Sequence, residues 1–167
     1  MKISHRMTKV LNDQIAMEAY ASNYYLSMGS WCEITGYEGA NNFFNQHADE
    51  ERQHMLKIIH YLNGLGASSI IPQVKQPPTT FKSLESICKI ALKNEQAVTK
   101  SVHKMVELAQ KEKDHITFDF LQWFVKEQIE EEQKFETILQ KFDLIGRDKL
   151  AIYEVDKALG SITTSKN

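Results

Sequence analysis

The chain has 167 residues, of which 42% are hydrophobic and 25% are charged, and its formal net charge is −2. This length suits one domain with a substantial core. The small net charge excludes the basic surface that attracts nucleic acid or anionic lipid, so we expect neither a nucleic acid nor a membrane as a partner. The first residues lack the apolar region expected of a secretion signal, and Cys32 and Cys88 are too few for a disulfide framework. These features predict a cytoplasmic protein with free, buried thiols.

Apolar side chains that recur three, four or seven residues apart predict four long helices and a short fifth one. In chain order, we expect these helices at about residues 5–33, 38–65, 82–110, 114–142 and 147–159. Most of the glycines lie near the predicted helix ends, where they interrupt the periodic pattern.

The connections between the helices predict their directions. The first and third connections are short, so each joins an antiparallel pair. The second connection, about residues 66–81, contains all three prolines. At roughly 3.3 Å per extended residue, it is long enough to run back along a helix of about 40 Å. The third helix should therefore run parallel to the second. The sequence predicts an all-α four-helix bundle with one long crossover connection and a short fifth helix. We expect one domain, residues 1–160, followed by a flexible polar tail, residues 161–167.

Polar side chains interrupt the apolar stripe of each long helix at the same height. They are Glu18, Glu51, His54, Glu95, Gln128 and Glu131. The first polar residue of each helix lies about 13 or 14 residues after the predicted helix start, which is close to mid-height. This is the level at which four bundled helices meet, whatever their directions. Glu51 and His54 are three residues apart, so they share a helical face.

Four carboxylates at this level predict a site for two metal ions. Each buried, unpaired carboxylate costs several kcal/mol, and the four repel one another. Two divalent cations would neutralise them. Oxygen-rich ligation with one imidazole favours iron or manganese over structural zinc. The alternative is a metal-free core of protonated, hydrogen-bonded glutamates.

The positions of the ligands suggest how two ions would be shared. We assign Glu18, Glu51 and His54 to one ion, and Glu51, Glu95 and Glu131 to the other, so that Glu51 bridges them. Gln128 is neutral where the pattern of such sites has a charged ligand, so the second ion should bind more weakly. A centre that releases metal suits transit better than permanent retention.

Four segments resemble the bacterial non-haem ferritins of the ferritin-like di-iron family. They are Tyr-Tyr-Leu at 24–26, His-Ala-Asp-Glu-Glu at 47–51, Phe-Leu-Gln-Trp-Phe at 120–124 and Glu-Gln-Ile-Glu-Glu-Glu at 127–132. The resemblance extends over essentially the whole chain. It implies a ferritin-like bundle that assembles into a homo-oligomeric shell of 24 chains. It also implies a ferroxidase that oxidises ferrous iron with dioxygen or hydrogen peroxide and stores the ferric mineral, without haem.

The resemblance also assigns roles to individual residues. The implied ferroxidase centre consists of Glu18, Glu51, His54, Glu95 and Gln128, with Tyr25 beside it. A possible third iron position is implied at Glu50, Glu127, Glu130 and Glu131. A solvated acidic face is the alternative for these last residues. His47 is expected either on the surface or behind the ligands. Asp114 is the expected N-cap of the fourth helix and, with Asp119, a candidate for an iron-entry pore.

Other readings of the sequence fit less well. A bacterioferritin would carry a haem-binding methionine where this chain has Arg52. A rubrerythrin-like peroxidase would need a cysteine module that is absent from the sequence. A DNA-coating mini-ferritin is disfavoured by the fifth helix, the long crossover and the lack of a basic tail. A helical interaction protein without metal would have no reason to place carboxylates at mid-height.

Overall fold

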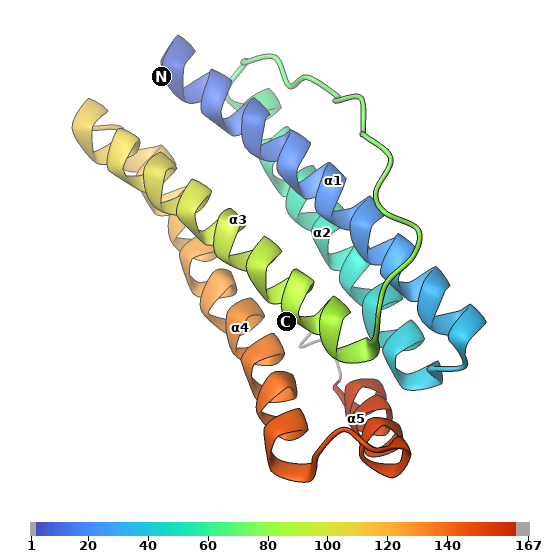
Figure 1. Ribbon diagram of the computed structural model, residues 1–167. Helices are drawn as coiled ribbons and strands as arrows, with labels where there is room; N and C mark the ends of the chain where they lie inside the picture. Colours follow the sequence, from blue (N-terminus) through green and yellow to red (C-terminus); the bar gives the residue numbers. More distant parts are fainter. Residues whose placement is uncertain (1–2, 163–167) are drawn as a thin grey trace.

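The computed structural model describes residues 3–162, which form five helices and no strand. The helices are α1 (His5–Thr35), α2 (Glu38–Gly64), α3 (Leu84–Glu112), α4 (His115–Ile145) and α5 (Lys149–Ser161). The four long helices form a bundle, and α5 lies at one end of it (Figure 1). The predicted all-α bundle with a short fifth helix is confirmed. Among the described residues, no helix has the length and apolar character needed to cross a membrane.

Side-chain caps fix where most of the helices begin. Ser4, Asp114 and Asp148 accept backbone N–H groups in the first turns of α1, α4 and α5. Ser83 and Ser86 form a reciprocal capping box at the start of α3. The predicted starts of the third and fifth helices were two residues too early, because apolar periodicity does not mark the capping residue. The N-cap expected at Asp114 is confirmed.

The connection formed by residues 65–83 sets the topology of the bundle. It leaves the end of α2 and runs along the outside of the bundle to the opposite end, where α3 begins (Figure 1). Asn12 and Ser27 of α1 hold its backbone through hydrogen bonds at residues 68, 70 and 78. As the length of this connection predicted, α2 and α3 run in the same direction.

The buried core consists of two apolar clusters with a polar layer between them. One cluster includes Tyr25, Phe44 and Phe135, and the other includes Leu11 and Phe124. On each long helix, a buried glutamate falls between the residues of the two clusters: Glu18, Glu51, Glu95 and Glu131. The polar layer is made of Gln14, Glu18, His47, Glu51, His54, Glu95, Gln128 and Glu131. The bundle therefore places its polar side chains at the mid-height level that the sequence predicted.

The start of α2 is capped by a residue from α5. Tyr37, at the N-cap position of α2, makes no side-chain capping bond. Instead, the carboxylate of Asp156 accepts the backbone N–H groups of Gly39 (3.2 Å) and Ala40 (2.8 Å). A Cβ atom at Gly39 would lie 1.9 Å from the carbonyl oxygen of Asp156, so only glycine permits this approach. A negative charge at a helix N-terminus is favourable, and α5 thus stabilises α2.

The predicted boundary between domain and tail falls at residue 160. In the structure, α5 continues to Ser161, and Ile162 packs against the apolar cluster around Tyr25. The rest of the predicted tail, residues 163–167, lies outside the described residues.

Candidate metal centre

The six side chains predicted at mid-height are all buried, and the structure brings them into one polar layer. Their exposed fractions are at most 4%, the value for His54. Glu18 comes from α1, Glu51 and His54 from α2, Glu95 from α3, and Gln128 and Glu131 from α4. Every long helix therefore contributes to the layer.

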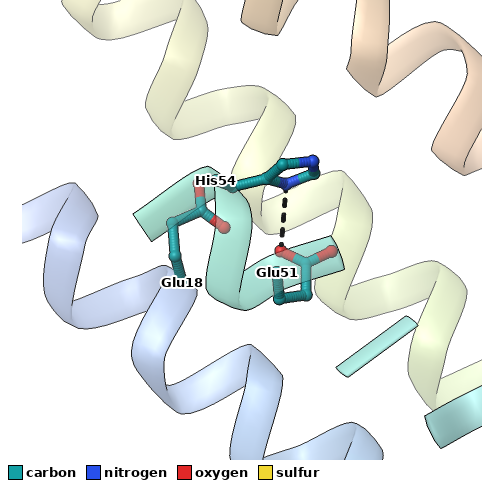
Figure 2. A group of neighbouring side chains, drawn as sticks. All are labelled: Glu18, Glu51 and His54. Carbon is teal, nitrogen blue, oxygen red and sulfur yellow. Dashed lines mark ion pairs between the residues drawn. The ribbon is translucent and has the colours of Figure 1, made fainter. Parts of the chain in front are cut away.

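Glu18, Glu51 and His54 form a compact group. One ligand atom from each residue lies within 4.8 Å of the other two. Figure 2 shows the carboxylate of Glu18 facing the two side chains of α2, and a distance of 3.4 Å joins His54 Nδ1 to Glu51 Oε2. Two carboxylates and an imidazole at this separation form a donor set that a divalent cation can occupy.

The structure leaves carboxylate oxygens of this group without hydrogen-bond partners. Gln14 donates to Glu18 Oε1 at 2.7 Å. Glu18 Oε2 and Glu51 Oε1 are buried, and neither has a hydrogen-bond partner within residues 3–162. Each unpaired buried atom costs about 1–3 kcal/mol. A cation between the two carboxylates would satisfy both atoms, so the group fits a metal ion better than a completed hydrogen-bonded core.

Protein donors occupy the other half of the layer. The Tyr25 hydroxyl donates to Glu95 Oε1, and Gln128 Nε2 donates to Glu95 Oε2 at 3.2 Å. Tyr25 therefore contacts a predicted ligand directly, and both oxygens of Glu95 have a donor. The structure brings Tyr25, Glu95 and Gln128 together, as the resemblance implied.

Glu131 is held on both sides as well. His47 Nε2 lies 2.6 Å from Glu131 Oε2, and Lys134 Nζ lies 2.8 Å from Glu131 Oε1. His47 is completely buried, so the expectation of a surface position was wrong and the alternative position behind the ligands holds. His47 lies one turn before Glu51, and this spacing was visible in the sequence.

Sequence reasoning missed Lys134. Its three-residue spacing from Glu131 was a signal, since residues three apart on a helix are neighbours. The carboxylate of Glu131 raises the pKa of the Lys134 ammonium, although partial burial acts in the opposite direction. A cation supplied by the protein itself therefore lies against the polar layer.

The four buried glutamates of the layer differ in the direction of their pKa shifts. Burial raises the pKa values of Glu18 and Glu51 well above the usual range, and neighbouring carboxylates raise them further. Burial and the charge of Glu131 raise the pKa of Glu95 to about 7. Burial also acts to raise the pKa of Glu131, but His47 and Lys134 outweigh it and lower the value to about 2. Without a cation, burial and neighbouring charge therefore favour the protonated forms of Glu18 and Glu51, whereas His47 and Lys134 favour the ionised form of Glu131.

A second group of possible ligands lies beside the first. One ligand atom each from His47, Glu50 and Glu131 lies within 4.8 Å of the other two. Glu127 Oε1 is 3.9 Å from His54 Nε2, and Glu127 is partly exposed. Glu130 is exposed and belongs to neither group of ligand atoms in the described part of the chain. A third iron position at these residues stays a prediction.

The structure thus defines a class of protein. Its members are helical bundles of two antiparallel pairs joined by one long crossover, with a buried cluster of carboxylates and histidine that could hold metal. Comparison with known proteins then identifies the family. A family model described as a ferritin-like domain matches residues 8–145. The chain belongs to the ferritin family, and the resemblance seen in its sequence is confirmed.

Individual relatives match nearly end to end. A probable bacterial non-heme ferritin-like protein of Haemophilus influenzae is 40% identical over 162 residues, covering 97% of this chain and 98% of that protein. A bacterial non-heme ferritin of Campylobacter jejuni is 42% identical over 164 residues, covering 98% of each chain. Among solved structures, an open pore ferritin from the archaeon Archaeoglobus fulgidus superposes with a TM-score of 0.94 at 36% identity. That match covers 98% of this chain and 100% of that one.

Proposed function

We propose that this protein stores iron. It binds ferrous iron at the buried centre, oxidises it with dioxygen or hydrogen peroxide, and keeps the ferric product inside a shell of 24 copies of the chain. The observation that carries this proposal is the pair of unpartnered carboxylate oxygens of Glu18 and Glu51, buried beside His54. Membership of the ferritin family supports the same function.

Each residue of the polar layer has a role in this proposal. Glu18, Glu51 and His54 bind the first ferrous ion. Glu51 extends to a second ion, which Glu95, Glu131 and Gln128 complete. The Tyr25 hydroxyl must leave Glu95 Oε1, or move, before that oxygen binds metal. The second ion therefore competes with hydrogen bonds that the protein already makes, and we expect it to bind more weakly.

Iron is a substrate of the proposed reaction, and its redox chemistry belongs to the metal. Each ferrous ion loses one electron. Two electrons and two protons convert dioxygen to hydrogen peroxide, or hydrogen peroxide to two water molecules. The protein holds the two ions close together and supplies negative charge. Because the pKa values of Glu18 and Glu51 are raised, cation binding releases protons from them.

Exposed apolar side chains support assembly into a shell. Large apolar residues lie exposed on the end of α1, the crossover connection, the end of α4 and α5. They include Ile34, Ile70, Ile71, Leu144 and Leu150. Where such side chains adjoin one another, they form apolar surface of the kind that marks an interface between proteins.

The cysteines and Arg52 support two further parts of the proposal. Cys32 and Cys88 are free and buried, which supports a reducing, cytoplasmic location. Arg52 is exposed at the position where a bacterioferritin would carry its haem ligand, so we propose that the shell contains no haem.

The proposal is tested by adding ferrous iron in air to the metal-stripped protein and following iron and protein together through size-exclusion chromatography. We expect far more than two irons per chain in one very large particle. A variant with Glu18→Gln and His54→Ala should form the same particle and load iron much more slowly. About two irons per chain in a small species would indicate a redox enzyme instead. A protein that takes up no iron would contradict the proposal that the buried cluster binds metal.

A further inference from the structure

The second group of possible ligands, His47, Glu50 and Glu131, already has a cation beside it, the ammonium of Lys134. Lys134 Nζ lies 2.8 Å from Glu131 Oε1 and 3.7 Å from Glu50 Oε2. The Lys134 side chain is only 15% exposed, so it lies against the bundle and does not extend into water. The ammonium therefore contacts both of the carboxylates that a metal ion at this position would need.

The same group has unpaired polar atoms that point to a ligand. His47 is completely buried, and its Nδ1 atom has no hydrogen-bond partner within residues 3–162. The buried Glu50 Oε2 atom likewise lacks one in the described structure. These two atoms are 3.5 Å apart, which is too long for a good hydrogen bond. One nitrogen and two carboxylate oxygens form a donor set suited to a divalent metal.

The rings around His47 keep it in this orientation. It stacks on Phe43 at 4.8 Å between ring centroids and meets Tyr25 and Phe135 edge-on. Because the imidazole is fixed between aromatic rings and bonded to Glu131, the group of ligands is preorganised. The flexible member is Lys134, whose long side chain reaches the group from the partly exposed edge of α4.

We propose, on the basis of the function proposed above, that the Lys134 ammonium takes the place of a third metal ion beside His47, Glu50 and Glu131. A divalent ion binds to His47, Glu50 and Glu131 only when the ammonium moves away, because the two cations would repel each other at contact distance. Lys134 thereby limits each chain to two tightly bound ions at the centre. It is a residue that determines how many metal ions the centre holds.

The experiment counts the metal ions bound to metal-stripped shells of the full chain. Zn²⁺ is titrated by calorimetry, and bound metal is measured after equilibrium dialysis, so that no oxidation is involved. We expect two tight ions per chain in the wild type. The Lys134→Met variant should bind a third ion at least tenfold more tightly than the wild type does. Lys134→Arg keeps the charge and should stay at two. Lys126→Met removes an exposed lysine from the same helix and should also stay at two.

A double variant tests where the additional ion binds. Combining Lys134→Met with Glu50→Gln should return the count to two. A Lys134→Met protein that still binds two ions would overturn the proposal, as would a wild type that binds three tightly. A wild type that binds no ion would contradict the proposed function instead. In that case, an ion gained in Lys134→Met and lost in the double variant would still support the role of Lys134. Size-exclusion chromatography and circular dichroism confirm that each variant is folded and assembled.

Discussion

In the half of the centre formed by Glu18, Glu51 and His54, two carboxylate oxygens are buried without hydrogen-bond partners in the described part of the chain. In the half formed by Glu95, Gln128 and Glu131, protein donors hold every carboxylate oxygen. The first half is preorganised for a cation, whereas the second half already has its own partners. Burial alone therefore does not make a metal site, since the available donors decide whether a carboxylate is free to bind. We expect the first half to bind first and more tightly.

The largest expected effect comes from removing the shared carboxylate. Glu51→Gln should weaken binding of the first metal ion by at least ~100-fold, more than the loss of an outer partner usually costs. The same change should raise the melting temperature of the metal-stripped protein, because a buried and repelled acid is replaced by a neutral amide. Zn²⁺ calorimetry and thermal unfolding measure the two effects. Asp49→Asn, at an exposed site on α2, is the control. Unchanged Zn²⁺ affinity in Glu51→Gln would refute the role of Glu51 as a metal ligand.

The pH dependence of stability separates Glu131 from the other three buried glutamates of the layer. Glu18, Glu51 and Glu95 have pKa values above the ordinary 4.5. They stabilise the fold while protonated, and this contribution is lost as the pH rises through the raised values, about 7 for Glu95. Glu131 behaves in the opposite way. Its contribution is present above 4.5 and is lost as the pH falls towards about 2.

We therefore expect the melting temperature of the metal-stripped protein to fall by about 5–10 °C between pH 5 and pH 8. Saturating Zn²⁺ should abolish this fall, because the cation stabilises the ionised carboxylates. Thermal unfolding in matched buffers measures both curves. A metal-stripped protein that is equally stable across this range would show that burial does not raise the pKa values of Glu18, Glu51 and Glu95.

Tyr25→Phe should make the second half more like the first. The change removes the donor from Glu95 Oε1 and leaves that oxygen unpaired. The metal-stripped protein should lose about 1–3 kcal/mol of stability, and the second Zn²⁺ should bind up to ~10-fold more tightly relative to the first. Urea unfolding and calorimetry measure these changes. Tyr24→Phe is the neighbouring control, because Tyr24 is only partly buried and packs against Phe81. Tighter binding of the first ion alone would contradict this account.

The smallest effect is expected at Glu130. Its side chain is exposed and lies outside both groups of ligand atoms in the described residues. Glu130→Gln should therefore change the affinity of the tight sites by less than ~2-fold, as expected for an exposed charge. Zn²⁺ calorimetry at fixed ionic strength measures this. A loss of one tightly bound ion would place Glu130 at the centre after all.

The sequence was sufficient to predict the bundle, its directions and the polar layer. The distance from each predicted helix start places Glu18, Glu51, Glu95 and Gln128 at one height, and a connection of known length allows only a limited set of topologies. The sequence was less informative about where helices begin. Ser83 and Asp148 define the starts of α3 and α5 through capping hydrogen bonds, which apolar periodicity does not reveal.

The partners of the ligands could not be predicted in the same way. Tyr25 and Glu95 lie on different helices, so their hydrogen bond depends on how α1 and α3 pack. Lys134 is three residues from Glu131, but a lysine at this spacing usually extends into water. Only the structure shows the side chain turned towards Glu131 and Glu50. Spacing along the helices thus identified candidate ligands and left open which of their oxygens are free.

The cap that Asp156 provides to α2 has a consequence for biosynthesis. The helix that carries Glu51 and His54 emerges from the ribosome early, but its first turn is completed by a residue made more than a hundred positions later. A nascent chain that stalls before Lys149 has every proposed ligand but lacks this cap. Its α2 would fray at one end until translation finishes. The last helix therefore couples completion of the polypeptide to the rigidity of the proposed metal centre.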